Sequence, residues 1–240
     1  MIAMPGTDGA RRLRPRLWDY NYYVMSLIRR AVEGFVTAHV PPGSGARVVD
    51  LGCGDRPYEP LFAGRAAEYL GVDVGANPAA DITLKPGEPV PLPDGAADVV
   101  ISSQVLEHVV DVAAYLGECR RLLRPGGWLL LSTHGFWLYH PYPTDVRRWT
   151  CWGLRHEIEQ HGFRVEVQRG CLGPLAYTTL LRLQLLRGLL YQAGRAAYPV
   201  IGACSAAAQL LMMLEDRITP RQVEQENAAV YVIAARRTQG

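Results

Sequence analysis

The chain has 240 residues, of which 49% are hydrophobic and 20% charged, and its formal net charge is +2. These values are ordinary for a globular protein with a sizeable core, and without a basic stripe they argue against nucleic-acid binding. The five cysteines lie far apart with no C-x-x-C pair, which argues against structural zinc or a disulfide framework. Residues 1–16 lack the apolar stretch of a signal peptide, so we expect a cytoplasmic protein.

An amphipathic helix is predicted near the N-terminus. Apolar side chains between Leu17 and Phe35 recur at steps of mostly three and four residues, which is the spacing of one helix face. The segment "PPGSG", Pro41 to Gly45, ends this helix. We therefore expect residues 1–40 to form a tail and a cap helix, whose aromatic stretch "WDYNYY" closes the substrate cavity.

Short apolar strands then alternate with helices. Strands are predicted at 46–52, 67–74, 97–104, 128–133, 163–169 and 228–237. Helices are predicted at 109–124 and 152–162, on the basis of their helical spacing of apolar residues. This alternation is typical of parallel βαβ units and predicts an α/β fold with a Rossmann-like, doubly wound sheet.

A helical block rich in Leu and Ala separates the last two predicted strands. At residues 171–220 it far exceeds a usual connection, so we expect an added layer on a core of residues 41–170 and 221–240. Residues 196–214 are uncharged over about the 20 residues that a membrane span needs, but Pro199 and Gln209 interrupt them. We expect no transmembrane span; a lid, a homodimer face and a membrane-surface helix stay open.

The segment "VVDLGCG" places two glycines directly after the first predicted strand. Glycine permits sharp turns and the close approach of another group, and ligands of open α/β sheets bind beyond the carboxyl ends of the strands. Gly52 and Gly54 would admit a ligand, and the start of the next helix would offer free N–H groups to its anionic part. Asp50 could hold an ammonium group, and Asp73, about 20 residues on, could bind ribose hydroxyls.

A mononucleoside with an amino-acid tail suits this site better than a dinucleotide. The dinucleotide pattern G-x-G-x-x-G requires a third glycine, but Pro57 stands at that position. A pyrophosphate would also lie between the acids Asp50 and Asp55, whereas a zwitterionic tail tolerates mixed charge.

Five segments, "VVDLGCG", "YLGVDV", "PLPDGAADVVISSQVLEHV", "LRPGGWLLLST" and "GLRHEIEQHGFRVE", resemble in order and spacing the motifs of class I S-adenosylmethionine-dependent methyltransferases, type-11 group. The resemblance spans residues 48–167, about half of the chain. It implies a seven-stranded sheet with a reversed last hairpin and S-adenosyl-L-methionine as the cofactor. The implied cofactor-binding residues are Asp50, Gly52, Cys53, Gly54, Asp73, Val74, Leu92 and Gln104.

The resemblance assigns the methionine end to Asp50, Gly52 and Gly54, the ribose to Asp73 and the methionine or sulfonium region to Gln104. Leu92 aligns near the adenine. The sequence departs from the family at Lys85–Gly87, where an acid beside the adenine is common. Asp81 or Glu88 could substitute, and backbone groups are an alternative.

Candidate catalytic residues lie in "HGFWLYHPYPTDVRRWTCWGL", residues 134–154. His134 or His140 could deprotonate an acceptor, because histidine titrates near neutral pH. Asp145 could orient one of them or pair with Arg148, and a purely structural loop is the alternative. We expect no metal site, because no further ligands accompany these residues.

The sequence therefore predicts a methyltransferase for a small acceptor with an O, N or C nucleophile, in bacterial specialised metabolism. The Leu, Tyr and Trp residues predicted around the cavity favour an apolar or aromatic acceptor. Two alternatives stay open. One is a cofactor-binding enzyme that catalyses cyclisation or rearrangement without methylation, and the other is a membrane-peripheral or scaffold protein with a vestigial cofactor site.

Overall fold

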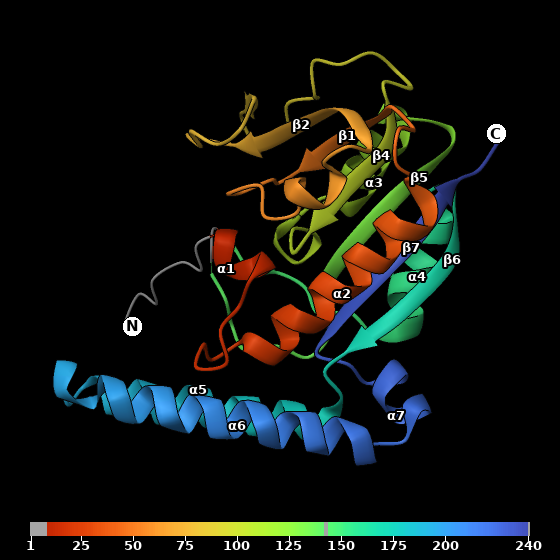
Figure 1. The fold of residues 1–240 in the computed structure, drawn as a ribbon. Coiled ribbons are helices and arrows are strands. Elements are labelled where there is room, and N and C mark those ends of the chain that lie inside the picture. The colour runs from red at the N-terminus through yellow and green to blue at the C-terminus, as the bar shows by residue number, and fades with distance from the viewer. Residues whose placement is uncertain (1–8, 142–143, 240) are drawn as a thin grey trace.

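One seven-stranded sheet forms the centre of the molecule (Figure 1). The computed structural model describes residues 9–141 and 144–239. The strands are β1 (Ala46–Leu51), β2 (Ala66–Val74), β3 (Ile82–Leu84), β4 (Ala97–Ser103), β5 (Leu123–His134), β6 (Phe163–Cys171) and β7 (Val230–Arg237). Their order is β3-β2-β1-β4-β5-β7-β6, and β7 runs antiparallel to both of its neighbours. The predicted doubly wound α/β fold with a reversed last hairpin is confirmed.

Helices cover both faces of the sheet. The α-helices are α1 (Gly9–Leu13), α2 (Tyr22–His39), α3 (Val112–Leu122), α4 (Cys151–Gln160), α5 (Pro174–Tyr191), α6 (Tyr198–Ile218) and α7 (Arg221–Glu226). The described residues also form three short 3-10 helices, η1 (Glu59–Phe62), η2 (Leu106–His108) and η3 (Arg195–Ala197). α2 packs on one face of the sheet in a cluster that also contains residues of α5 and α6. α3 and α4 pack on the other face in a second cluster.

The predicted N-terminal helix begins later than its apolar spacing suggests. α2 starts at Tyr22, and the preceding residues form a turn in which Asp19 accepts the N–H of Arg16 through its side chain at 2.8 Å. The N–H of Asp19 donates back to the C=O of Arg16 at 2.8 Å. An aspartate that bonds nearby backbone groups competes with helix formation, so the prediction that the helix includes Leu17 and Tyr20 is wrong.

The stretch between β2 and β4 contains a strand that the sequence analysis missed. β3 has only three residues, Ile82–Leu84, and pairs in parallel with the end of β2. The departure at Lys85–Gly87 lies in a turn that the side chain of Glu88 closes by accepting the N–H of Lys85 at 2.9 Å. This use of Glu88 within its own turn does not favour it as an adenine-binding acid.

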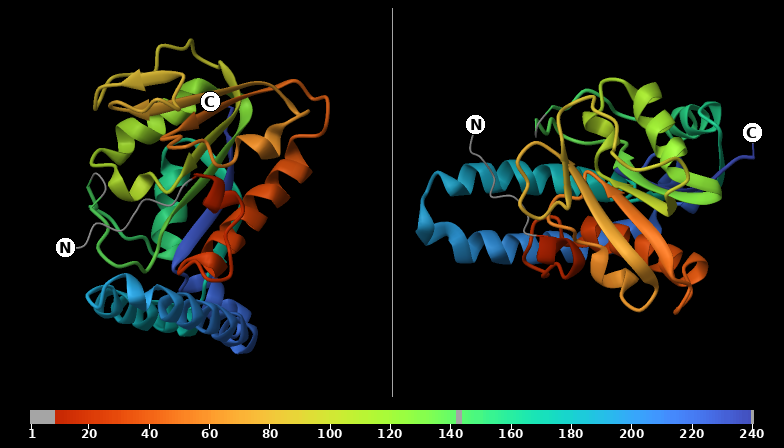
Figure 2. Two further views of the ribbon diagram at one scale, coloured as in Figure 1. Left: turned by 60° about the vertical axis from the view of Figure 1, so that its left-hand side comes forward. Right: turned by 90° about the horizontal axis from the view of Figure 1, so that it is seen from above.

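α5 and α6 form an antiparallel hairpin that extends beyond one end of the sheet (Figures 1 and 2). The hairpin stands between β6 and β7 in the chain. Within the described residues, one helical stretch, Arg195–Ile218, has the length and composition of a membrane span. A single such helix is weak support for a membrane span, because a core helix of a soluble protein can be equally long and apolar.

Candidate functional site

The turn after β1 is built around Gly52. Its φ of 74° lies in the left-handed region, and a Cβ there would lie 2.5 Å from a methyl carbon of Val105. Gly54 has a φ of 50°, and a Cβ there would meet no atom within 4 Å, so open space lies beside its backbone. The open side of Gly54 leaves room for the close approach of a ligand, which stays a prediction.

The expected helix N-terminus with free N–H groups is absent from this turn, and that prediction is wrong. The N–H groups of Gly52 and Cys53 both donate to the C=O of Val72, at 2.8 and 3.1 Å. Only the four-residue η1 follows. Pro60 has no N–H to donate to the C=O of Arg56 and its ring would clash with that carbonyl, so an α-helix cannot run from the turn through this residue.

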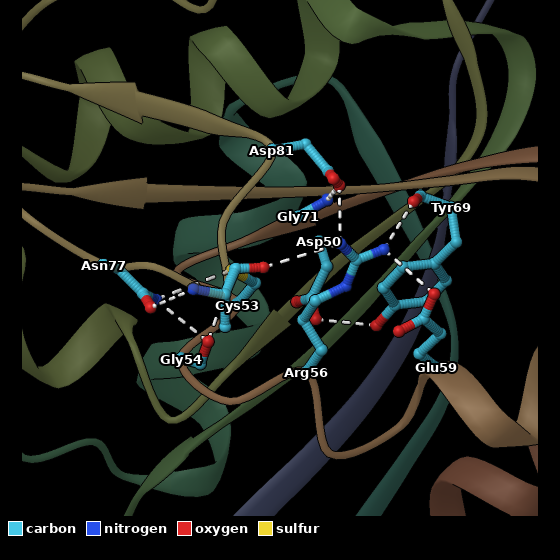
Figure 3. Close-up of polar contacts among 10 residues, drawn as sticks. Asp50, Cys53, Gly54, Arg56, Glu59, Tyr69, Gly71, Asn77 and Asp81 are labelled. Carbon is cyan, nitrogen blue, oxygen red and sulfur yellow. Dashed lines mark hydrogen bonds and ion pairs between the residues drawn. The ribbon is translucent and has the colours of Figure 1, made fainter.

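Asp50 is buried at the end of β1 and accepts a hydrogen bond from the Tyr69 hydroxyl at 2.6 Å (Figure 3). Burial raises the pKa of Asp50 to about 6, and the hydrogen bond from Tyr69 opposes this rise. A carboxylate that is costly to ionise gains most from a nearby cation. Asp50 is therefore suited to the ammonium group of an amino-acid tail.

Arg56 links the turn to β2, a role that the sequence did not reveal. It has a φ of 53°, and its guanidinium donates to Asp81 at 2.7 Å, to Glu59 at 2.9 Å and to the C=O of Tyr69 at 2.8 Å (Figure 3). Because Asp81 also accepts the N–H of Gly71 at 2.8 Å, its carboxylate is engaged within the fold. This engagement does not favour Asp81 as an adenine ligand.

Asp73, at the end of β2, lies next to the glycine turn. One of its carboxylate oxygens accepts the N–H of Gly54 at 3.1 Å and the side-chain amide of Asn77 at 2.6 Å. The other oxygen accepts the N–H of Val74 at 2.8 Å. A carboxylate offers about four acceptor positions, so one position remains for a ribose hydroxyl, and a second becomes free if Asn77 turns away.

The other predicted cofactor residues lie around the same edge of the sheet. The side chain of Cys53 packs towards Gly71, and burial raises the pKa of its thiol to about 12. Val74 is exposed beside Asp73, and Leu92 packs partly buried on the apolar cluster. Gln104 has a φ of 58° and donates its side-chain amide to the hydroxyl of Ser132 at 3.1 Å.

These residues fit S-adenosylmethionine. The open space beside Gly54 admits the ligand, and Asp50 lies opposite Gly71 of β2, two residues before Asp73, so the two acids stand at the same edge of the sheet. Asp50 would hold the ammonium group and Asp73 the ribose, while the exposed side chain of Val74 offers an apolar surface to the adenine. The cofactor would supply a methyl group that is already activated by the sulfonium.

His134 is buried at the end of β5. Its ring stacks on Trp137 with centroids 4.8 Å apart, and its Nδ1 lies 3.4 Å from a carboxylate oxygen of Glu107. Burial lowers the pKa of His134 to about 3 and raises the pKa of Glu107, which accepts the Thr133 hydroxyl at 2.8 Å. His134 is therefore neutral near pH 7, and Glu107 is a neighbour for which the sequence analysis assigned no role.

His140 is exposed, and Asp145 holds the backbone of the segment that carries it. The carboxylate of Asp145 accepts the backbone N–H of His140 at 2.7 Å and pairs with the guanidinium of Arg148. The hydrogen bond from Arg148 lowers the pKa of Asp145, and partial burial lowers the pKa of His140. The structure thus brings His134, His140 and Asp145 together, with ring centroids of the two histidines 6.2 Å apart.

Residues 144–147 are tied to the loop after β4. The N–H of Val146 donates to the C=O of Glu107 at 3.0 Å, and the Thr144 hydroxyl donates to the C=O of His108 at 3.1 Å. Arg147 donates to the C=O of Val110 at 2.8 Å. Because this loop directly follows Gln104, the histidine segment lies beside the predicted sulfonium end of the cofactor.

No metal-binding group of three or more His, Cys, Asp or Glu side chains occurs in residues 9–141 and 144–239. The five cysteines are all free.

Comparison with known proteins identifies the family. The sequence profile of a family described as "Methyltransferase domain" matches residues 18–167, more than half of the chain. The chain belongs to this methyltransferase family. The class I fold and the cofactor S-adenosylmethionine, both predicted from the motifs, are confirmed.

Two curated relatives of this methyltransferase domain have similar sequences. An S-adenosylmethionine-dependent methyltransferase of Mycolicibacterium smegmatis is 33% identical over 138 residues, covering 51% of this chain and 54% of the relative. A ubiquinone biosynthesis O-methyltransferase of Pseudomonas aeruginosa is 35% identical over 104 residues, covering 38% of this chain and 45% of the relative. The chain thus spans about half the length of these curated relatives. The α5–α6 hairpin lies outside the matched region.

Among solved structures, the [4+2]-cyclase SpnF is similar to this methyltransferase domain with a TM-score of 0.56 and 20% identity. The match covers 88% of this chain and 82% of SpnF. At this identity the likeness concerns the fold alone.

Proposed function

We propose that this protein transfers the methyl group of S-adenosylmethionine to a hydroxyl group of a small apolar or aromatic molecule. The observation that carries the proposal is the set of hydrogen bonds between residues 144–147 and residues 107–110, because they hold the histidine segment against the loop after β4, where the methyl end of the cofactor is predicted to lie. Exposed apolar side chains in that segment, among them Phe136, Leu138 and Tyr139, suit an apolar acceptor. The O-methyltransferase named among the relatives favours oxygen over nitrogen or carbon, and a role in bacterial specialised metabolism is part of the proposal.

The proposed roles follow from burial. His140 is exposed, so it can reach an acceptor hydroxyl and take its proton. His134 is buried against Trp137 and acts as a positioning residue, since Trp137 also stacks on Tyr177 of α5 with centroids 6.1 Å apart. Asp145 positions His140 through its backbone. In-line placement of the two reactants supplies much of the rate, so one base suffices.

Incubation with methyl-labelled S-adenosylmethionine and a panel of phenols and hydroxylated apolar compounds tests the function. We expect label in the product, detected by mass spectrometry. An unlabelled rearranged product would instead support the cyclisation alternative. No heat of S-adenosylmethionine binding in calorimetry would support the scaffold alternative.

Replacement of His140 by alanine tests the base. We expect kcat to fall about 100-fold, because a positioned base contributes roughly that factor, while affinity for S-adenosylmethionine stays unchanged. The backbone N–H that binds Asp145 is retained in this variant. Since the base must be neutral and partial burial lowers the pKa of His140, the wild-type rate should fall only below about pH 6.5.

His156→Ala is the matched control, because His156 is an exposed histidine on α4. It should leave kcat and the pH profile unchanged. An unaltered kcat in His140→Ala would show that His140 is not the base.

A further inference from the structure

The α5–α6 hairpin exposes apolar side chains. On α6 the residues Val200, Leu210, Leu214 and Ile218 are spaced as one helix face and are 51%, 56%, 55% and 67% exposed. On α5 the side chains of Leu185, Leu186 and Leu189 are also exposed. Of the most apolar 18-residue stretch within Arg195–Ile218, only 22% is buried in the structure. An apolar face of this extent marks an interaction surface.

The inward face of α6 carries polar residues beside the apolar Ile201 and Met212, and hydrogen bonds of these polar residues fix the orientation of the helix. The side chain of Gln209 accepts the N–H of Tyr23 at 2.9 Å and donates to the C=O of Tyr20 at 2.8 Å. Asp216 accepts the N–H of Gly173 at 3.0 Å. Rotation of α6 to bury its leucines would leave these groups without partners, which is costly. The apolar face must therefore point outward.

The charges around this face are positive. α5 and α6, with the turn between them, contain four arginines and two acids, but the acids Glu215 and Asp216 are buried, whereas Arg182, Arg195 and Arg217 are exposed. Arg187 is buried between the rings of Tyr20 and Tyr191, and its Nε and Nη1 have no hydrogen-bond partner among the described residues. The exposed charges of the hairpin are therefore all positive.

Two aromatic residues lie near the Arg195 end of α6. Tyr198 is exposed at the first position of α6. The exposed Trp18 lies against the helix, because its Cβ is 3.9 Å from where a Cβ of Gly202 would be. Tyr198 and Gly202 each lie two residues, or about 200°, from Val200 around α6, so neither aromatic residue is part of the outward apolar face.

We propose that the outward face of the α5–α6 hairpin binds a lipid surface rich in anionic headgroups. Exposed leucines enter the acyl region while Arg182 and Arg195 contact the phosphates, as in other interfacial helices. The bonded Gln209 and Asp216 keep α6 attached to the domain, so the hairpin lies on the membrane and does not cross it. A second copy of the chain suits this face less well, because a two-fold interface would bring together two surfaces whose exposed charges are all positive.

Sedimentation with vesicles tests the proposal. The full chain should bind vesicles of phosphatidylcholine mixed with phosphatidylglycerol, and bind phosphatidylcholine alone at least about tenfold more weakly. The double variant Leu210→Glu/Leu214→Glu should lower affinity for the mixed vesicles about tenfold or more. The double variant Arg182→Gln/Arg195→Gln should lower affinity for the mixed vesicles about 30-fold, since each basic residue near an anionic surface raises binding affinity about fivefold.

Val167→Glu is the matched control, because Val167 is an exposed apolar residue on β6, away from the hairpin. It should leave vesicle binding unchanged. S-adenosylmethionine affinity should be normal in every variant and so verify folding. Equal binding by the wild type and the leucine variant would overturn the proposal. The proposal would also be overturned if, in sedimentation velocity, the wild type were a dimer and the leucine variant a monomer, and if the wild type did not bind vesicles.

Discussion

Replacement of Asp73 by alanine is expected to weaken S-adenosylmethionine binding about 100-fold, or by about 2.7 kcal/mol. The carboxylate at the end of β2 is the proposed acceptor for the ribose hydroxyls, and a hydrogen bond to a charged group contributes about 1.5–3 kcal/mol. The variant also removes the acceptor of the Gly54 N–H, so the glycine turn loses part of its support. Isothermal titration calorimetry measures the affinity directly.

Asn77→Ala is the matched control for Asp73→Ala. It removes another partner of the same carboxylate oxygen but keeps the carboxylate itself. We expect affinity within about threefold of the wild type, because Asn77 bonds Asp73 and not the ligand, and the carboxylate keeps its acceptor positions for the ribose hydroxyls. Equal affinity of Asp73→Ala and the wild type would place the ribose elsewhere.

Replacement of Asp50 by asparagine should stabilise the protein without cofactor and weaken cofactor binding at least about tenfold. Burial raises the pKa of Asp50 to about 6 from an ordinary value of 3.8. The folded state therefore binds the proton more tightly than the unfolded state, and ionisation costs stability. The cost is absent below pH 3.8, grows towards pH 6 and is complete above it. It amounts to at most about 3 kcal/mol.

Chemical denaturation at several pH values measures this effect. Asparagine keeps an acceptor for the Tyr69 hydroxyl, so the variant should gain stability at pH 8 and little at pH 4. Asp98→Asn should instead lose stability at pH 8 and little at pH 4. Burial opposes the ionisation of Asp98, but hydrogen bonds from the Arg47 N–H and from Arg124 outweigh it and lower the pKa of Asp98. A loss of stability in Asp50→Asn at pH 8 would contradict the assignment.

The wild type should show the corresponding pH dependence of binding. An ammonium group beside Asp50 favours the ionised carboxylate, so cofactor affinity should fall as the pH decreases below about 6.

Most strands of the sheet could be predicted from the sequence, because buried strands appear as short runs of apolar residues. β3 was missed because three residues, Ile82–Leu84, are too short to show a period. The start of α2 was placed too early because Leu17 and Tyr20 continue the apolar spacing, while Asp19 closes a local turn that the spacing does not reveal.

The proximity of Asp50 and Asp73 could be predicted, because neighbouring parallel strands end at the same edge of a sheet. Tyr69 could not be assigned to Asp50, since that contact depends on the register in which Asp50 lies opposite Gly71. The role of Arg56 depends on a left-handed backbone conformation that is rare outside glycine. Such contacts between distant residues leave no local sequence pattern.

The helical nature of residues 171–220 followed from composition, but the orientation of α6 did not. Ser205, Gln209 and Asp216 would normally be assigned to the solvent side of a helix. They are buried here, and Gln209 and Asp216 bond backbone groups of other segments.

The position of β7 between β5 and β6 constrains how the chain assembles. β6 pairs only with β7 in the described sheet, and the whole hairpin is synthesised between them. During translation β6 has no strand to pair with on either edge until residues 230–237 have been synthesised and have inserted beside β5. Assembly of this part of the sheet is therefore a late step between residues far apart in the chain, and such steps tend to be slow. Until it is complete, the unpaired edges of β6 are accessible to chaperones.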